Sequence, residues 1–281
     1  MSDYLISIVT VNYNDNERLK KTLQSVSKQS FSNYEHIIID AASTDGSVDT
    51  IRQYEKETNH LTYWCSEPDK GIYNGMNKAV LVAKGKYCIF MNSGDTFYSR
   101  DVLQKVAPLL AGGDFYVGCS MLVSNHGIEK EIPPRKMSIE FLASNSPNHQ
   151  STFTRTVILK ERPYNEHYKL VADWEKLFTE WLLYGRSYHP IDIVIAYYHL
   201  DGVSSIKLEE VELERNEAVK KAIPDYILKG ILREEDLTLL ESKIRKAMKR
   251  APVQRDLKIL RNAFKFLVKD VWHELMHRFK K

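Results

Sequence analysis

The sequence predicts an α/β fold in which an open, mostly parallel sheet is flanked by helices and followed by a C-terminal helical extension. Short β-branched runs alternate with helical patterns over the first hundred residues, and no strand pattern appears after residue 209. The 281 residues are 43% hydrophobic, which suffices for a sizeable core, and the chain has no low-complexity stretch. We therefore expect one α/β domain over residues 1–206 and a basic helical extension over residues 207–281.

Four strands are predicted in the first half of the chain, each with few polar residues, as expected for strands covered on both faces. They span residues 5–11, 34–40, 61–65 and 87–91. The intervening helices are predicted from Leu19, Leu23 and Val26 at helical spacing, over 48–57, and over 73–83. Ligands of such sheets bind outside the carboxyl ends of the strands, so polar residues at those ends are candidates for function.

The alternation is weaker after residue 101. Strands are predicted over 115–123 and 191–198, with a shorter apolar segment at 150–153. A tryptophan-rich helix is predicted over 173–184, and further helices from residue 209 are interrupted near Pro224 and Pro252.

The amino terminus begins with a predicted strand and has no basic and apolar signal-peptide pattern. No run approaches the roughly 18 apolar residues of a spanning helix. Cys65, Cys88 and Cys119 are widely spaced and have no metal-ligand pattern, so we expect reduced thiols and a cytoplasmic protein.

The turn after the first strand has no glycine over residues 12–16. Rossmann dinucleotide sites and P-loops need glycine there, because backbone N–H groups must approach phosphate. A sugar nucleotidyltransferase would likewise need a glycine-rich basic loop at this point. The sequence therefore disfavours all three kinds of site.

Three carboxylates follow strands or begin helices: Asp40, Asp95 and Asp173. Singly, Asp40 and Asp95 are typical of turns and Asp173 of a helix N-cap. Together at one sheet edge they fit another role, in which one carboxylate binds a hard divalent cation and a separate one accepts a proton from an attacking hydroxyl.

Four segments in order carry a family resemblance: SIVTVNYN, LQSVSKQSF, HIIIDAASTDGS and SEPDKGIYNGMNKAVLVAKGKYCIFMNSGD. Over residues 7–96 the chain resembles the amino-terminal half of a family 2 glycosyltransferase of the GT-A fold. Weaker matches are HQSTF at 149–153, ADWEKL around Asp173 and YYHLDGVSS at 197–205. The resemblance implies that residues 1–206 form a catalytic domain that transfers a sugar, with inversion, from a nucleotide diphosphosugar, usually a UDP-sugar.

The resemblance also implies roles for residues of the donor site. Asp40 accepts a hydrogen bond from the base N–H, which suits an acceptor-only carboxylate. The other donor-binding residues implied are Thr10, Asn12 and Tyr13 around the base, and Asp69, Lys70 and Gly71 beside the nucleotide. A solvated surface side chain is the alternative for Lys70.

Metal and catalytic residues are implied in the same way. Asp95 is the one acid of the NSGD turn and would bind Mg²⁺ or Mn²⁺, with His199 as a further ligand or a packing residue. Asp173 matches the catalytic base. His149 and Arg155 match the segment that borders the donor phosphate and the acceptor, with purely structural or solvated roles as the alternative.

The basic charge lies in the tail, where residues 207–281 hold 19 Lys and Arg against 13 Asp and Glu. Within 253–281, apolar residues at three- and four-residue spacing interleave with lysine and arginine. This pattern predicts a helix that binds an anionic membrane surface from the cytoplasmic side and brings the enzyme to a glycan or lipid-linked acceptor. Packing on the catalytic domain, or on a second subunit of a homodimer, is the alternative.

A different class of function also fits the tail. The protein would then be a non-catalytic membrane-binding or nucleotide-sugar-binding protein. A nucleic-acid partner is not expected, because residues 1–206 are net acidic and contain no nucleic-acid-binding motif.

Overall fold

A computed structural model describes residues 4–138, 141–142, 145–200 and 207–222. Residues 4–136 and 147–214, without 201–206, belong to one compact unit. The strands are β1 (Tyr4–Asn12), β2 (Tyr34–Asp40), β3 (Leu61–Ser66), β4 (Gly85–Phe90), β5 (Thr96–Phe97), β6 (Phe115–Ser124), β7 (Gly127–Glu131), β8 (Thr152–Arg155) and β9 (Tyr188–His199). The helices are α1 (Asn16–Ser27), α2 (Ser47–Glu57), α3 (Ile72–Val82), α4 (Val102–Val106), α6 (Thr156–Glu161), α7 (Ala172–Tyr184) and α9 (Leu208–Ala222).

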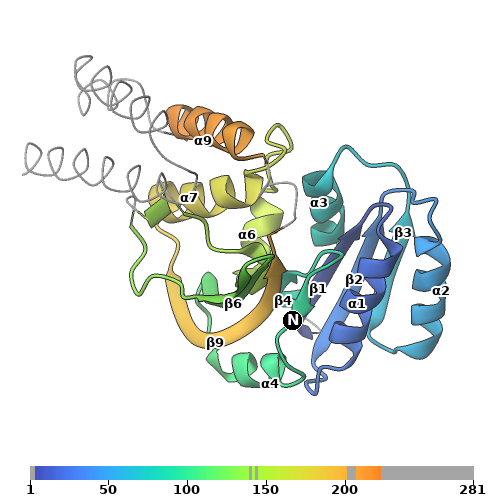
Figure 1. Cartoon of the computed structure of the whole chain (residues 1–281). Helices are drawn as coiled ribbons and strands as arrows, with labels where there is room; N and C mark the ends of the chain where they lie inside the picture. The colour runs from blue at the N-terminus through green and yellow to red at the C-terminus, as the bar shows by residue number, and fades with distance from the viewer. Residues whose placement is uncertain (1–3, 139–140, 143–144, 201–206, 223–281) are drawn as a thin grey trace, which may run out of the picture. The chain divides into compact units, whose positions relative to one another are not determined.

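Within the described residues the strands form one nine-stranded sheet (Figure 1). Its order is β3-β2-β1-β4-β8-β6-β9-β5, and β7 extends β6 as a hairpin. Strands β1 to β4 are parallel, whereas β8 is antiparallel to both β4 and β6. The first half of the sheet is thus built from strand–helix–strand units, and the second half from mixed pairings.

The order in which successive strands join the sheet reverses between β3 and β4. The chain runs from β1 through β2 to β3 in one direction across the sheet, and β4 then pairs with the other side of β1. Right-handed crossovers therefore place α3 on the face opposite α1 and α2. The loops that follow β1 and β4 separate at this switch point, which is where open α/β sheets bind ligands.

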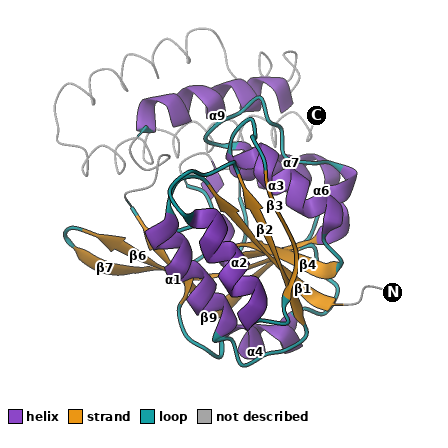
Figure 2. Ribbon diagram, turned by 90° about the vertical axis from the view of Figure 1, so that its right-hand side faces the viewer, coloured by secondary structure: helices purple, strands orange, loops and turns teal. Residues whose placement is uncertain are grey.

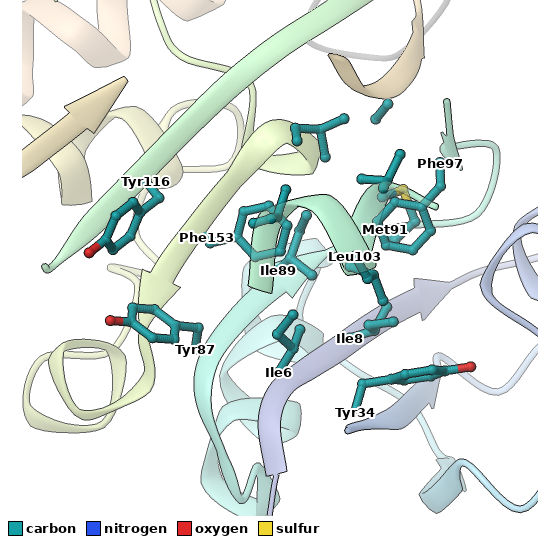
Figure 3. Packing of buried hydrophobic residues seen from close by; sticks show 14 of the residues in the cluster. Ile6, Ile8, Tyr34, Tyr87, Ile89, Met91, Phe97, Leu103, Tyr116 and Phe153 are labelled. Carbon is teal, nitrogen blue, oxygen red and sulfur yellow. The ribbon is translucent and has the colours of Figure 1, made fainter. Parts of the chain in front are cut away.

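Two hydrophobic clusters lie on the α1 face of the sheet, because Ile6 and Ile8 pair in register with Tyr34 and His36, on the same side of β2 as Ile38. Leu19 and Leu23 of α1 and Ile51 of α2 pack with Ile38 of β2 on this face (Figure 2). A larger cluster on β1, β4 and β8 includes Ile6, Ile8, Ile89 and Phe153 (Figure 3). On the opposite face α3 lies close to β1, since a Cβ on Gly75 would meet Val11 at 2.8 Å.

A buried ionic cluster holds the carboxyl-terminal half of α7. Glu180, with a side chain only 1% exposed, accepts two hydrogen bonds from the Arg162 guanidinium at 2.7 and 2.6 Å. Lys176 and Arg186 also contact this carboxylate, at 3.0 and 3.4 Å. A buried charge needs such partners, so α7 is fixed to the segment that follows α6.

The predicted α/β class and the seven strands and helices expected in residues 5–91 are confirmed, with bounds that differ by a few residues. Strands β5 and β7 and helices α4 and α6 were not predicted. The amphipathic segment 253–281 lies outside the described residues, and the division at residue 207 stays a prediction. In the part of the chain that the structure describes, no helix is long and apolar enough to cross a membrane.

Candidate active site

The loop after β2 surrounds Asp40 with hydrogen-bond donors. Its Oδ1 accepts from Asn12 Nδ2 at 2.7 Å and from the Ser43 hydroxyl at 2.6 Å. Its Oδ2 accepts from the Ser43 backbone N–H at 2.9 Å and from the Ser66 hydroxyl at 2.6 Å. The carboxylate is fully buried and its four acceptor positions are all used, which makes it the organising centre of the ends of β1, β2 and β3.

Tyr13 and Thr10, both predicted beside the base, lie in different surroundings. Tyr13 follows β1 and is 66% exposed, so its ring faces solvent at the edge of the sheet. Thr10 is fully buried. Its hydroxyl lies 3.0 Å from His36 Nε2 and donates to the Met91 carbonyl at 2.7 Å, and these bonds tie β1, β2 and β4 together behind the edge.

The turn after β4 meets the turn after β1. Ser93 Oγ donates to Asn12 Oδ1 at 2.7 Å, and Asn92 Oδ1 accepts from the Val11 backbone N–H at 3.3 Å. Gly94 has φ +102°, a conformation that favours glycine, and directs the chain back to Asp95. The predicted metal ligand thus lies across the switch point from Asn12 and Asp40.

The segment before α3 forms a tight turn. The backbone N–H of Gly71 donates to Asp69 Oδ1 at 2.8 Å, and Gly71 itself has φ +121°. Lys70 is exposed, and its backbone N–H donates to Asn74 Oδ1 at 3.3 Å. The turn leads directly into α3, whose second residue, Tyr73, donates a hydrogen bond to Asp173 of α7.

His149 lies between two candidate carboxylates. Its Nδ1 is 3.1 Å from Asp173 Oδ2, and its Nε2 is 3.8 Å from Asp95 Oδ2 and 3.2 Å from Asn92 Nδ2. The side chains of His149 and Asp173 are each 21% exposed. Residues far apart in the sequence therefore form one acid–imidazole–acid series at the edge of the sheet.

Charge inside this series shifts two pKa values. Burial disfavours the imidazolium of His149, but the interactions with Asp173 and Asp95 outweigh burial and raise the pKa to about 10. Burial also opposes ionisation of Asp173, yet the His149 contact and the Tyr73 hydrogen bond lower the pKa of this carboxyl below its usual value. The two carboxylates thus favour the charged form of His149, whereas the Asn92 amide donor beside Nε2 opposes it.

Two predicted residues lie apart from this series. Arg155 is 3.7 Å from Asp114 and pairs in register with Tyr87, near the start of β4 and away from its carboxyl end. His199 is exposed at the end of β9, two residues beyond Tyr197, which pairs with Thr96. The structure therefore does not bring Arg155 to the site, and it places His199 on the strand beside the Asp95 turn.

The sequence profile described as Glycosyl transferase family 2 matches residues 7–171, which is more than half of the chain. This chain is a family 2 glycosyltransferase. An uncharacterized glycosyltransferase of Mycobacterium tuberculosis (strain ATCC 25618 / H37Rv) is 31% identical over 211 residues, covering 71% of this chain and 77% of the relative. The putative teichuronic acid biosynthesis glycosyltransferase TuaG of Bacillus subtilis (strain 168) is 39% identical over 103 residues, covering 36% and 40%.

Solved structures show the same fold. S. aureus TarS 1-349 in complex with UDP-GlcNAc matches with a TM-score of 0.62 at 19% identity, over 95% of this chain and 81% of that chain. Glucosyl-3-phosphoglycerate synthase from Mycobacterium tuberculosis, in complex with Mn²⁺, UDP and glucosyl-3-phosphoglycerate, matches with a TM-score of 0.55 at 14% identity, over 79% and 81%. The predicted GT-A fold of this glycosyltransferase is thereby confirmed.

The side chains around Asp95 in this glycosyltransferase supply only part of a coordination shell for a divalent cation. Asp95 Oδ1 accepts from Gln150 Nε2 at 3.1 Å, while Oδ2 lies beyond hydrogen-bond distance of His149 and has the hard oxygen chemistry that Mg²⁺ and Mn²⁺ prefer. Among the described residues, no three His, Cys, Asp or Glu side chains are grouped to hold a metal. A cation here would take one protein carboxylate and most of its ligands from diphosphate and water.

Sequence reasoning missed several residues of this glycosyltransferase site. Ser43 and Ser66 bond Asp40, Gln150 bonds Asp95, and Tyr73 bonds Asp173. All four lie in segments that carry the family resemblance, which was an available signal. Tyr73 differs from the other three because its partner Asp173 is one hundred residues away, so nothing near it in the sequence links it to a candidate carboxylate.

Proposed function

We propose that this glycosyltransferase moves a sugar from a UDP-sugar to a hydroxyl of a glycan or lipid-linked acceptor, with inversion at the anomeric carbon. The observation that carries the proposal is the juxtaposition of Asp95, His149 and Asp173 at the switch point of the sheet. A relative named for teichuronic acid biosynthesis supports a role in cell-surface polysaccharide synthesis.

The donor base binds beside the ends of β1 and β2. The exposed ring of Tyr13 supplies a flat apolar face for the uracil, and Asn12 and Asp40 supply polar contacts. Asp40 already accepts four hydrogen bonds, so a base N–H reaches it only when a hydroxyl such as that of Ser66 turns away. Thr10 does not contact the base in this proposal; its buried hydroxyl supports the base site by bonding His36 of β2 and the Met91 carbonyl after β4.

The diphosphate lies between the Asp95 turn and the segment of Asp69, Lys70 and Gly71. Asp95 would hold Mg²⁺ or Mn²⁺, with His199 on the neighbouring strand as a further ligand, and a bound cation would stabilise the negative charge of the departing diphosphate. Lys70 is exposed and free to approach phosphate, whereas Arg155 has no part in the proposal. We expect Asp95→Ala to remove the Mn²⁺-dependent increase in UDP affinity.

Asp173 is the base. The acceptor oxygen attacks the anomeric carbon as the carbon–oxygen bond to the diphosphate breaks, and the bonding electron pair leaves with UDP. The acceptor proton passes to Asp173, which the lowered pKa keeps ionised. His149 holds Asp173 Oδ2 and carries positive charge next to the site of diphosphate departure.

The test is release of UDP from UDP-glucose, UDP-galactose and UDP-GlcNAc in the presence of Mn²⁺, with GDP-mannose for comparison. Asp173→Asn should lower turnover by about 10²-fold or more while UDP affinity stays within about twofold. Asp192→Asn, at an exposed carboxylate of β9, is the matched control. Turnover of Asp173→Asn at the wild-type rate would exclude the base role, and no release from any donor would favour a binding protein.

The tail proposal rests on sequence alone. Residues 253–281 would bind an anionic membrane surface, each basic residue contributing about 1 kcal/mol near the surface. Co-sedimentation of the full chain, and of a chain ending at residue 251, with anionic and neutral vesicles tests it. Equal sedimentation of both chains favours packing on the enzyme or on a second subunit.

A further inference from the structure

Helix α3 joins the donor segment to the segment that leads into the catalytic helix. It begins directly after Gly71, and two of its asparagines hold Glu166. Asn74 Nδ2 donates to Glu166 Oε2 at 2.9 Å, and Asn77 Nδ2 donates to Glu166 Oε1 at 2.9 Å. Asn77 also exchanges hydrogen bonds with the backbone N–H and carbonyl of Tyr164. One face of α3 thus fixes the chain shortly before Asp173.

Tyr73 extends this contact to the candidate base. Its side chain is buried, its ring packs against Tyr164 with centroids 5.7 Å apart, and its hydroxyl donates to Asp173 Oδ1 at 2.8 Å. The backbone N–H of Trp174 donates to the same oxygen at 2.9 Å. Oδ1 therefore has two donors, while Oδ2 has His149 and one remaining lone pair.

We propose that Tyr73 is the positioning residue of the catalytic base. By holding Oδ1, its hydroxyl fixes the rotation of the carboxylate and leaves the second oxygen to take the acceptor proton. Because Tyr73 lies two residues after Gly71, the same helix sets the position of the donor segment and of the base. This inference rests on the proposed function, in which Asp173 accepts the proton.

Removal of the Tyr73 hydroxyl has two expected effects. The carboxylate becomes free to rotate, and the charged form of Asp173 loses one donor. The titratable groups that face Asp173 are His149, Tyr73 and Tyr164, and Asp95 lies beyond His149. The pKa of Asp173 should therefore rise when Tyr73 loses its hydroxyl, while the other neighbours stay in place.

The experiment compares Tyr73→Phe with Tyr87→Phe. Tyr87 is also buried and its hydroxyl bonds Gly112 and Gly113, away from the candidate site, so both variants lose one buried tyrosine hydroxyl. In UDP release from the donor with the fastest turnover, Tyr73→Phe should lower kcat about tenfold or more, as for a lost hydrogen bond to a charged group. UDP affinity should stay within about twofold, and the acid limb of the pH–rate profile should move to higher pH.

A double variant separates failure of this inference from failure of the proposed function. If Tyr73 acts through Asp173, Tyr73→Phe adds no further loss in an Asp173→Asn background. If Asp173→Asn is inactive while Tyr73→Phe keeps the wild-type kcat and pH profile, the positioning role of Tyr73 is overturned and the proposed base is not. Wild-type turnover in Asp173→Asn overturns both. A kcat loss in Tyr87→Phe equal to that in Tyr73→Phe, with no shift of the acid limb, assigns the effect to general destabilisation and overturns the inference. Thermal unfolding of each variant verifies that it is folded.

Discussion

Strand β2 carries buried polar groups at both ends, and the two ends serve different purposes. Near its start, Glu35 accepts from Ser7 Oγ and from the backbone N–H groups of Lys84 and Gly85, and Thr62 donates to its other oxygen. We call Glu35, His36 and their bonded partners the inner group. At its end, Asp40 is equally buried, but its partners lie beside the exposed Tyr13 at the switch point. We call Asp40, Asp95, His149 and Asp173 the edge group.

The difference lies in what satisfies each carboxylate. Backbone N–H groups cannot turn away, so the inner carboxylate is held in one arrangement and stabilises the fold. Each carboxylate also has two hydroxyl donors, but Asp40 has only one backbone donor, and one of its hydroxyls belongs to the exposed Ser66. A ligand can therefore replace the Ser66 hydroxyl without leaving a buried donor unpaired. Equal burial and equal numbers of hydrogen bonds therefore do not mark a residue as structural.

The largest effect that tests this contrast is on stability. Glu35→Ala removes the acceptor of the Lys84 backbone N–H and of the buried Ser7 hydroxyl, and leaves the Gly85 N–H with Ser7 Oγ alone, so it should lower the free energy of unfolding by about 3 kcal/mol. Urea unfolding measures the change. Glu35→Gln is the control, because its amide oxygen still accepts from these N–H groups. A lower UDP affinity in folded Glu35→Ala would contradict the division between the two groups.

His36 and His149 should give opposite pH dependence of stability. Burial, followed by the charge of His60, lowers the pKa of His36 to about 3, below the unfolded value near 6.5. The unfolded chain then binds a proton that the folded chain does not, and stability should fall by about 2 kcal/mol between pH 7.5 and pH 5. Urea unfolding at several pH values checks this.

His149 should contribute to the pH dependence of stability with the opposite sign from His36. Its folded pKa of about 10 lies above the unfolded value, so its contribution is present below pH 6.5 and is lost as the pH rises toward 10. Imidazole NMR signals of the metal-free protein should show His36 neutral and His149 charged throughout pH 7–8. A titration midpoint near 6.5 for either ring would contradict the assignment.

A smaller effect sharpens the contrast at Asp40. In Asp40→Asn an amide N–H must face either the Ser43 backbone N–H or Asn12 Nδ2, so we expect UDP to bind about tenfold more weakly. Ser66→Ala removes only the hydroxyl proposed to yield to the base, and UDP affinity should hold or rise. Calorimetric titration with UDP measures both. An equal loss in Ser66→Ala would show that Ser66 itself binds the donor.

The sequence predicted the first half of the fold well because parallel strands there are continuously apolar. Strand β2 was predicted over residues 34–40, as observed. Strand β7, with the sequence GIEKE, is mostly exposed and has no apolar alternation, so no local signal marks it. Helix α6 has only six residues, too few for helical periodicity.

The same limit applies to the candidate site. The candidate carboxylates were found because each follows a strand or begins a helix. The contact between Tyr73 and Asp173 depends on how α3 packs beside the chain before α7, which no pattern within either segment encodes. Arg155 was expected near the donor because the family resemblance implies that its segment borders the donor phosphate, whereas the antiparallel pairing of β8 with β4 places Arg155 near the start of β4.

The anchoring of α7 bears on which parts of this enzyme can change during evolution. The ionic cluster at Glu180 and the bonds to Asp173 attach both parts of this helix to the central body. The hairpin of β6 and β7, by contrast, projects from the body and exposes Ile128 (Figure 2). Mutations can accumulate in such an exposed hairpin without displacing Asp173, the proposed base, so the periphery of this enzyme can vary while the proposed reaction is conserved.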